Sequence, residues 1–302
     1  MPSKQIKSYP LNQSPFYKLQ SKKRLARILG TSLEFLNRLV HAENLYRCEI
    51  IQANGKPRQI EKPCLPLKQL QRRISDLLHR IEKPNYLFCP AQGKSYIGNA
   101  QMHITATVVR SLDIKSYYTS TVSRRIYWFF HKRMHCSSDV AALLTVIATF
   151  EDRLPTGSPA SPMLSYYAHI DMWEEIYALV IQAGCTLTVY MDDLTISGKN
   201  VPGVLMWEIK KQIRRCGLRY HKERYYHHKT SEVTGIIISN GELKLPHRKH
   251  ENIHTLRSQL FTQTDPKAKR KIRQRIQGCL SEFQQLEDAN SLSASQEYNL
   301  RS

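Results

Sequence analysis

The stretch that most constrains the fold of this chain is residues 187–198, which read LTVYMDDLTISG. Apolar and polar residues alternate across 187–191, and this period of two predicts a β-strand. Residues 194–198 return to β-favouring types and close on a glycine, which predicts a second strand. Two strands joined at Asp192 and Asp193 predict a β-hairpin with both carboxylates at its bend.

Burying Asp192 and Asp193 at a hairpin tip is costly unless a positive charge lies beside them. A divalent cation fits there, because hard cations bind carboxylate oxygens. A third acid, Asp113, lies near the end of a short apolar-rich run at residues 108–114. Acids from a strand and a hairpin can meet around two Mg²⁺ ions about 3.5–4 Å apart, which is the apparatus of in-line nucleotidyl transfer. The competing interpretation is that the Asp-Asp pair only stabilises a turn.

The net charge indicates what kind of partner the chain binds. The chain has 302 residues, with 45 Lys and Arg against 25 Asp and Glu, a formal net charge of +20 and 41% hydrophobic residues. This hydrophobic content is enough for a folded core, and a folded protein this basic is expected to bind a polyanion. Nucleic acid is favoured over a membrane, because the longest apolar run, residues 140–150, is too short to span a bilayer and no signal peptide is recognisable.

The cysteines do not predict a disulfide framework or a metal site. Seven are scattered along the chain, and none forms a Cys-x-x-Cys pair. We expect reduced, packed thiols, as in a cytosolic protein. His131, His135 and Cys136 have metal-like spacing but lack a fourth ligand, so a zinc site is not predicted.

Three strings in the sequence together resemble one protein family. Tyr-Met-Asp-Asp at residues 190–193 lies roughly 80 residues after Asp113 and resembles the catalytic hairpin of reverse transcriptases. Asn-Ala-Gln-Met-His at residues 99–103, just upstream of Asp113, matches the Asn-Ala-x-x-His signature of retron reverse transcriptases. Val-Thr-Gly at residues 233–235, roughly 40 residues after the acid pair, matches the second retron signature. The chain is therefore similar to the retron reverse transcriptases, bacterial enzymes that make branched RNA-linked DNA.

The resemblance implies an RNA-directed DNA polymerase that copies a cognate structured non-coding RNA into branched RNA-linked single-stranded DNA (msDNA). Synthesis would start from the 2′-hydroxyl of an internal guanosine, with two Mg²⁺ ions as cofactors. The implied partners are the retron RNA, its msDNA product, deoxynucleoside triphosphates and an effector or toxin protein encoded nearby, within an antiphage defence system. The implied location is the bacterial cytoplasm, without a membrane partner. No RNase H, endonuclease or integrase domain is expected in this sequence.

The resemblance also implies roles for particular residues, which fall into three groups. The catalytic acids, which would bind metal together with Ile114, are Asp113, Asp192 and Asp193. The residues implied to contact the incoming nucleotide are Arg58, Tyr118 and Gly157. The residues implied to contact RNA are Asn99, His103, Val233, Thr234 and Gly235. For Asn99 and His103, a structural hydrogen-bond pair is the alternative.

Two positions depart from the family pattern. Thr156 stands where the family usually has Gln, which weakens any claim of a side-chain amide contact to the nucleotide. Gly157 beside it still permits close approach of the backbone. Arg224 stands where the family usually has a Lys that protonates pyrophosphate, and Arg cannot readily give up a proton. That role therefore stays open between Lys222 and a purely electrostatic contribution.

Two of the nucleotide contacts are chosen by position. The resemblance implies an aromatic ring that abuts the sugar and excludes a 2′-hydroxyl, and Tyr118 lies at the expected spacing of five residues after Asp113. Tyr117 precedes it, and alternation along a strand would point only one of the two rings toward the site. Arg58, on a predicted hairpin, is implied to clasp the triphosphate through a charge-assisted contact.

The expected fold class is α+β, as a right-hand polymerase with fingers, a palm carrying an antiparallel sheet and the YMDD hairpin, and a helical thumb. The implied domains are an N-terminal helical extension at 1–45, fingers at 46–107, a palm at 108–240 with a fingers segment at about 121–153, and a thumb with a C-terminal tail at 241–302. Each boundary follows the order of the motifs along the chain.

Local patterns predict the elements inside these domains. Thr31-Ser32 is expected to start a helix, and Gly217 to end another across 204–216. A hairpin is expected across 46–63, with its turn at Asn54-Gly55. The other predicted elements are helices from residue 65, across 121–153, from 164 to about 180 and across 247–288, a β-rich run across 231–238, a turn at Asn240-Gly241 and a frayed tail over the last dozen residues.

Two other functions stay open from the sequence. One is another bacterial reverse transcriptase, maturase-like or defence-associated, primed from a 3′-end, although the retron signatures argue against it. The other is a ribonucleoprotein scaffold that binds RNA and restrains an effector, with synthesis incidental. Changing Asp192 and Asp193 to Asn would separate synthesis from scaffolding, and the chemistry of priming would separate the two kinds of reverse transcriptase.

Overall fold

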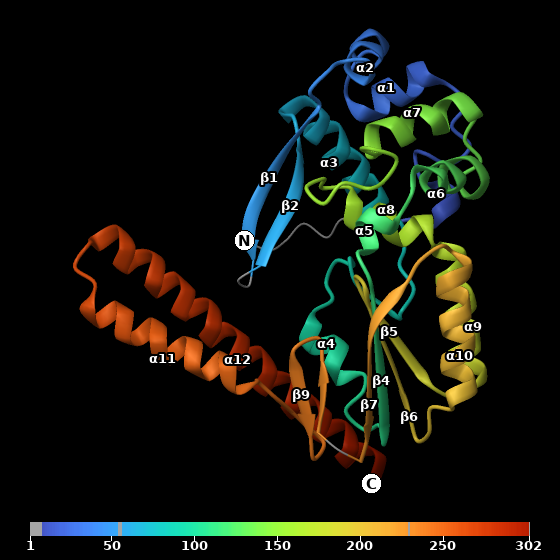
Figure 1. The fold of residues 1–302 in the computed structure, drawn as a ribbon. Helices are drawn as coiled ribbons and strands as arrows, with labels where there is room; N and C mark the ends of the chain where they lie inside the picture. The colour runs from blue at the N-terminus through green and yellow to red at the C-terminus, as the bar shows by residue number, and fades with distance from the viewer. Residues whose placement is uncertain (1–7, 54–55, 229, 302) are drawn as a thin grey trace. The chain divides into compact units, whose positions relative to one another are not determined.

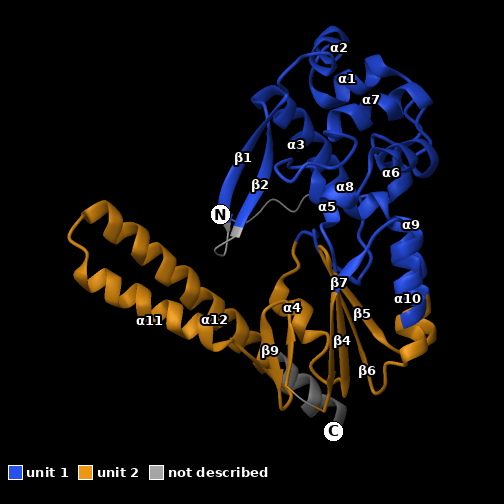
Figure 2. Cartoon of the chain, in the orientation of Figure 1, with its two compact units in different colours: residues 1–92, 114–178, 207–221 blue, residues 93–113, 179–206, 222–302 orange. Residues whose placement is uncertain are grey.

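The computed structural model of the chain describes residues 8–53, 56–228 and 230–301. It contains helices and sheets in both halves of the chain, so the predicted α+β class is confirmed (Figure 1). The chain forms two compact units and passes between them several times (Figure 2). Unit 1 comprises residues 1–92, 114–178 and 207–221, and unit 2 comprises residues 93–113, 179–206 and 222–302. Every helix among the described residues is too short or too polar to span a bilayer.

Unit 1 is mainly helical and carries one β-hairpin. The hairpin strands, β1 (Tyr46–Ala53) and β2 (Lys56–Pro63), pair antiparallel along their full length. The other elements that lie wholly or mainly in this unit are a 3₁₀ turn (Leu11–Gln13), α1 (Lys22–Leu29), α2 (Leu33–Val40), α3 (Leu65–His79), β3 (Leu87–Cys89), α5 (Tyr117–Ser120), α6 (Ser123–Trp128), a π-helical turn (Phe129–Arg133), α7 (Ser138–Ala148), α8 (Ser161–Ala168), α9 (Ile170–Gln182) and α10 (Gly203–Arg215).

Unit 2 is built on β-strands with a pair of long helices. The strands are β4 (Val108–Ile114), β5 (Thr186–Tyr190), β6 (Asp193–Gly198), β7 (Tyr220–His227), β8 (Ser231–Val233), β9 (Ile236–Ser239) and β10 (Glu242–Lys244). The helices are α4 (Tyr96–Gln101), α11 (His247–Thr262) and α12 (Pro266–Arg301), and the last two run side by side (Figure 1). Strands β5, β6, β4 and β7 are neighbours in that order, and β10, β9 and β8 form a small sheet of their own.

Several local predictions are confirmed. The Ser32 side chain accepts a hydrogen bond from the Phe35 amide at 3.1 Å and so caps α2. Gly217 follows α10 with φ of +77°, a left-handed conformation that glycine adopts without strain. The hairpin across 46–63 is present, but the predicted turn at Asn54-Gly55 lies outside the described residues. The two C-terminal helices also form where their periodicity predicted them.

Other predicted elements differ from the structure. The β-rich run across 231–238 is broken into β8 and β9 by a two-residue turn, Thr234-Gly235, with φ of +48° and +81°. Paired positive φ values are typical of the tight turns that join twisted antiparallel strands. The helix predicted from 164 to about 180 is two helices, because the backbone of His169 leaves the helical conformation between them. The backbone stays helical to Arg301, where a frayed tail was expected.

The sheet of unit 2 has one mainly apolar face and one face that carries the acids. On β4 and β6, Asp113 lies opposite Asp193 and Ser111 opposite Thr195, and directly paired residues share a face. The intervening residues face the other side; Leu112, Leu194 and Ile196 among them are apolar and fully buried, and Arg110 is the charged exception. On the face that carries the acids, α4, α12 and the small sheet pack in one cluster that includes Ile97, Ala100, Val109, Val233, Ile236 and Leu286. This face is therefore covered, near Val109, by α4, α12 and the small sheet.

Candidate active site

The hairpin that carries the acid pair has a two-residue turn. Tyr190 pairs with Asp193, so Met191 and Asp192 form the turn and Asp193 is the first residue of β6. Met191 has φ of +57°, in the left-handed region that side chains other than glycine rarely occupy. The sequence placed both acids at the bend, whereas the register puts Asp193 on the strand. Asp193 therefore has a side-chain direction fixed by strand pairing.

Asp113 and Asp193 come from strands far apart in the sequence and lie directly opposite each other. They are register partners on the antiparallel pair β4–β6, near the end of β4 and at the start of β6. Side chains of directly opposed residues project to the same face with Cβ atoms about 4.5–5.5 Å apart. Asp192 immediately precedes Asp193 in the chain and acts electrostatically on it. The three acids thus occupy one end of the sheet.

The acids perturb one another. Burial, together with the neighbouring carboxylates of Asp192 and Asp113, raises the pKa of Asp193 to about 6, although the positive charges of Arg224 and Lys222 act in the opposite direction. Like charges gathered in a partly buried site are unfavourable unless a cation joins them. The donors are carboxylate oxygens, which hard divalent cations prefer. Within the described residues, no three His, Cys, Asp or Glu side chains already surround a common metal position.

A pocket of about 260 Å³ opens beside Asp113 and Asp193. Cationic side chains and the tight Thr234-Gly235 turn line it together with the acids; the basic residues are Lys222, Arg224 and Arg248. Glu232 lies 3.0 Å from the Arg248 guanidinium and 3.8 Å from that of Arg224, and so holds both near the pocket. Acids beside cations suit a phosphate-bearing substrate that arrives with divalent ions. Sequence reasoning did not predict that the Val-Thr-Gly string would reach this pocket.

The two polar residues of the Asn-Ala-x-x-His string are inside the protein. Asn99 and His103 are each only 1% exposed. The His103 ring nitrogens Nδ1 and Nε2 lie 2.7 Å from the hydroxyls of Ser197 and Thr188, respectively. Asn99 Nδ2 donates to Thr234 Oγ1 at 3.3 Å. Side chains buried this deeply present no surface to RNA, so the structural alternative fits both residues better than direct RNA contact.

The tyrosine pair after Asp113 lies on a helix, α5, rather than on a strand, so the alternation argument does not apply. Tyr117 is buried, donates its hydroxyl to the Ser165 carbonyl at 2.8 Å and accepts from Trp173 Nε1 at 3.1 Å. Tyr117 is therefore a core residue of unit 1. Tyr118 is half-buried, and it stays the candidate for contact with a nucleotide.

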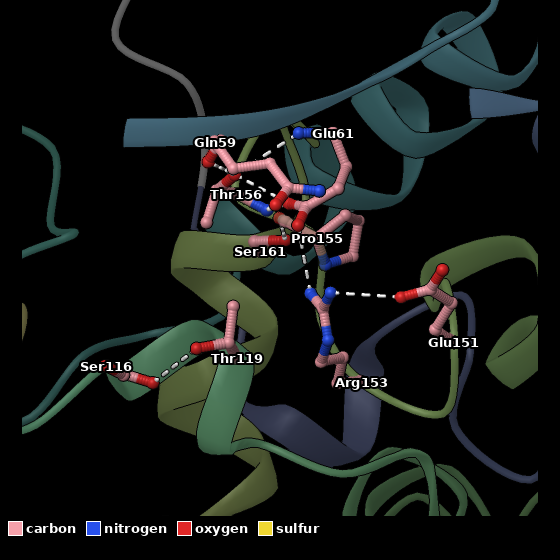
Figure 3. Close-up of polar contacts among 9 residues, drawn as sticks. All are labelled: Gln59, Glu61, Ser116, Thr119, Glu151, Arg153, Pro155, Thr156 and Ser161. Carbon is pink, nitrogen blue, oxygen red and sulfur yellow. Dashed lines mark hydrogen bonds and ion pairs between the residues drawn. The ribbon is translucent and has the colours of Figure 1, made fainter. Parts of the chain in front are cut away.

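Gly157 lies against the backbone of the β1–β2 hairpin. A Cβ at Gly157 would be 2.3 Å from the Glu61 carbonyl oxygen, closer than real Cβ contacts come. Next to it, the Thr156 amide and hydroxyl donate to Glu61 Oε2 at 2.9 and 2.7 Å, and Arg153 lies 3.1 Å from Glu61 Oε1 (Figure 3). The close approach that Gly157 permits is thus to β2. Arg58, on the same strand, is exposed.

The Glu61 contacts were not predicted. Glu61 sits in a basic, exposed-looking string on β2, and nothing local distinguishes it from a solvated carboxylate. In the structure its side chain is buried and accepts hydrogen bonds from both Thr156 and Arg153. The sequence feature that could have indicated the Glu61 contacts is Thr156, which stands where the family usually has Gln. A short hydroxyl at that position needs a hydrogen-bond acceptor close by.

Replacing Glu61 by Gln is expected to destabilise the protein by about 1–3 kcal/mol at pH 7, because Arg153 loses a buried ionic partner. Burial raises the pKa of Glu61, but the donors on Thr156 and the Arg153 charge outweigh it, so the pKa lies below its usual 4.5. A depressed folded-state pKa gives stability that is present above the unfolded pKa and is lost as the pH falls through the folded value. The difference between the wild-type protein and E61Q in unfolding free energy, measured by denaturant titration, should therefore shrink as the pH falls below 4.5.

Glu151→Gln is the matched control, since exposed Glu151 pairs with the same Arg153 guanidinium at 3.2 Å. Exposed ion pairs contribute little, so this change is expected to stay within about 0.5 kcal/mol. Equal losses for the two variants, or a difference for E61Q that does not vary with pH, would contradict the role assigned to the Glu61 carboxylate.

Several known proteins are related to this chain in sequence. No protein-family profile matches the chain. It is 28% identical over 204 residues to the Retron Se72 reverse transcriptase of Salmonella heidelberg, covering 64% of this chain and 54% of that protein. It is 24% identical over 240 residues to the Retron Ec86 reverse transcriptase of Escherichia coli, covering 76% and 75%, respectively. The Retron Mx162 reverse transcriptase of Myxococcus xanthus is 25% identical over 261 residues, covering 73% and 54%.

The chain is a distant homologue of the retron reverse transcriptases. The resemblance drawn from the three sequence strings is thereby confirmed. These relatives are RNA-directed DNA polymerases, an enzyme class whose chemistry requires divalent metal. This retron reverse transcriptase homologue spans about half the length of the Salmonella and Myxococcus proteins that it matches and three quarters of the Escherichia coli one.

Proposed function

We propose that this chain is the RNA-directed DNA polymerase of a retron. The observation that carries the proposal is the register of β4 and β6, which sets Asp113 opposite Asp193 beside the turn that holds Asp192. Three carboxylates gathered at one end of a sheet, next to a pocket with cationic walls, suit nucleotidyl transfer. The distant homology to retron reverse transcriptases supports the same activity.

The polymerase subdomains follow from this proposal. The β1–β2 hairpin and α3 correspond to fingers, the sheet that contains β4, β5 and β6 to the palm, and the paired helices α11 and α12 to the thumb. Residues 8–45 form the N-terminal helical extension, which contains α1 and α2. Each assignment rests on the order of elements along the chain and on the homology.

In the proposed site, Asp113, Asp192 and Asp193, with Ile114 at the end of β4, would hold two Mg²⁺ ions. Bound Mg²⁺ would activate the attacking hydroxyl and neutralise charge on the triphosphate. The cationic side chains that line the pocket would bind phosphates; Lys222 and Arg224 flank Asp113 and Asp193 there. Arg224 cannot act as a general acid, so its contribution is electrostatic.

Residues of unit 1 would contact the incoming nucleotide. The exposed Arg58 would bind its triphosphate, and the Tyr118 ring would exclude a ribose 2′-hydroxyl. Gly157 would act through the hairpin: its close contact with Glu61 fixes the base of the strand that carries Arg58. These roles are proposed from the resemblance to reverse transcriptases together with the local contacts of each residue.

The template and product would lie along a basic helix. Lys267, Lys271 and Arg275 recur every four residues on α12, so they share one face, and all three are exposed. Phosphate contacts make binding weaken linearly with the logarithm of salt concentration, by about 0.7–0.9 in slope for each phosphate neutralised. Changing all three residues to Gln should reduce the slope by roughly 2 to 3, measured by filter binding to oligo(dT)-primed poly(rA).

A control for the salt experiment is Lys22→Gln, because Lys22 lies on α1 with Asp139 3.8 Å away. This variant should keep the wild-type slope. If the triple variant also kept it, α12 would not contact phosphates, and the assignment of this helix to the thumb would lose its electrostatic basis.

The finer proposal is that synthesis starts from a guanosine 2′-hydroxyl within a cognate structured RNA and leaves branched msDNA. The test is to co-express the chain with the RNA encoded beside its gene and to isolate small DNA. A product released from its RNA by a debranching enzyme supports the retron activity. A product with an ordinary 3′,5′ linkage to its primer would indicate a reverse transcriptase primed from a 3′-end. An effector protein encoded nearby, and a place in antiphage defence, are proposed on the homology.

A further inference from the structure

The two retron strings meet inside the protein, where α4 and the turn after it make two sets of side-chain hydrogen bonds, which together we call the α4 joint. It consists of Asn99 and His103 from α4 and the turn that follows it, Thr188 and Ser197 from the acid-bearing hairpin, and Thr234 from the β8–β9 turn. These five residues come from segments spread over more than a hundred positions of sequence. Through these two sets, α4 and the turn after it are bonded both to the acid-bearing hairpin and to the β8–β9 turn, which lines the pocket beside the acids.

The His103 ring bonds to both arms of the catalytic hairpin. Thr188 lies on β5, two residues before Tyr190, and Ser197 lies on β6, four residues after Asp193. The even spacing puts Ser197 on the same face of the sheet as Asp193. One imidazole therefore bridges the two strands whose connecting turn carries Asp192.

The chemistry of the ring matches its two partners. Burial lowers the pKa of His103 to about 3, so the imidazole is neutral at physiological pH. A neutral imidazole has one donor and one acceptor nitrogen, and a hydroxyl can serve either. Thr188 and Ser197 are themselves buried, so each hydroxyl depends on such a partner. No nitrogen of the ring is left over for a nucleic acid.

Asn99 extends the same joint to the rim of the pocket. Its Nδ2 donates to Thr234 Oγ1, and that hydroxyl in turn donates to the Tyr96 carbonyl at 3.1 Å. Thr234 lines the pocket beside Asp113 and Asp193. The positive φ of Thr234 is unusual for a β-branched residue, and bonds from α4 hold it there. α4 and the turn after it thus contact both the hairpin and the β8–β9 turn.

From this geometry we infer that His103 is a positioning residue, which fixes the hairpin bearing Asp192 and Asp193 through Thr188 and Ser197 and does not contact RNA. The inference rests on the proposed polymerase function. It assigns to the Asn-Ala-x-x-His string the role of supporting the catalytic hairpin from inside the protein. Misplacement of a reacting group by about 1 Å can cost roughly 100-fold in rate. Loss of the joint should accordingly lower kcat while the KM for nucleotide and the affinity for RNA stay nearly constant.

The test compares His103→Phe, His103→Asn and the double variant T188V/S197A with the wild-type protein. The assay is extension of oligo(dT) on poly(rA), which needs no retron RNA. His103→Phe keeps a ring but removes both nitrogens, so kcat should fall roughly 10- to 100-fold, with the KM for dTTP within about threefold. Asn places an amide near the position of Nδ1 and should rescue part of the loss. The double variant keeps the ring and removes both hydroxyls, and should resemble His103→Phe.

Binding of the RNA encoded beside the gene, measured by filter binding, distinguishes this role from an RNA contact. All three variants should bind that RNA within about threefold of wild type, and so should Met102→Ala, a control on the adjacent residue, which is 52% exposed. Normal extension by His103→Phe with lost RNA binding would overturn the inference. If His103→Phe fails to fold, unchanged extension by T188V/S197A overturns it equally. A wild-type protein that does not extend the primer would refute the proposed function instead.

Discussion

Changing Asp192 and Asp193 together to Asn is expected to lower primer extension at least roughly 1,000-fold while RNA affinity stays within about threefold. Asn keeps the shape of each side chain but removes the charge that would hold a divalent cation. Burial and the neighbouring acids raise the pKa of Asp193, so the wild-type site bears an unfavourable concentration of negative charge that a cation would relieve. The measurement is single-turnover extension of oligo(dT) on poly(rA), with filter binding of the flanking RNA.

The same variant separates the polymerase from an RNA scaffold. Because the change removes two carboxylates that repel each other, the midpoint temperature of thermal unfolding, measured without divalent metal, should be equal to or higher than that of the wild-type protein. Asp76→Asn, an exposed acid on α3, is the control and should retain full extension. Residual synthesis near the wild-type rate would refute the assignment of the acids. A cellular phenotype that survives the double change would belong to the RNA-bound protein rather than to its product.

Changing Gly157 to Ala is expected to destabilise the protein by about 1–3 kcal/mol or more. The added Cβ would meet the Glu61 carbonyl oxygen at 2.3 Å and its carbon at 2.9 Å. Both are backbone atoms of β2, so neither can rotate aside as a side chain would. Relief requires that the loop and the hairpin separate, which also weakens the bonds between Thr156 and Glu61. The loss of unfolding free energy is measured by denaturant titration, followed by tryptophan fluorescence or by far-UV circular dichroism.

Gly278→Ala is the matched control for this substitution. Gly278 lies inside α12 with open space where its Cβ would be, so alanine there should stabilise the helix by about 0.5–1 kcal/mol. The opposite signs expected for two identical substitutions isolate the clash at Gly157 from any general effect of alanine. A neutral or stabilising Gly157→Ala would mean that the hairpin does not approach the loop as closely as the structure has it.

The two retron strings illustrate how a motif can be recognised without its role being known. Their residue types identified the family, and the homology to retron reverse transcriptases agrees. Asn99 and His103 nevertheless lie in the interior, and only the Val-Thr-Gly string, residues 233–235, lines the pocket. A buried position can be as restricted in its chemistry as a binding one, because each of its polar groups needs a particular partner.

Sequence by itself determined the local elements and the family. Alternation over residues 187–191 predicted β5, the Ser32 cap predicted α2, and Gly217 predicted the end of α10. These features depend on neighbours within about four positions, so the chain carries them without reference to the rest of the fold. One wrong prediction was also local. The Thr234-Gly235 turn was not predicted, because it lies within a β-favouring run and Thr rarely takes a positive φ.

Only the tertiary structure decided which distant residues meet. Strand register set Asp113 opposite Asp193, although nearly eighty residues separate them. Packing placed Gly157 against Glu61 and enclosed His103 between Thr188 and Ser197. Such contacts are properties of surfaces brought together on folding, and no period, cap or turn signal in either segment encodes the identity of the partner segment.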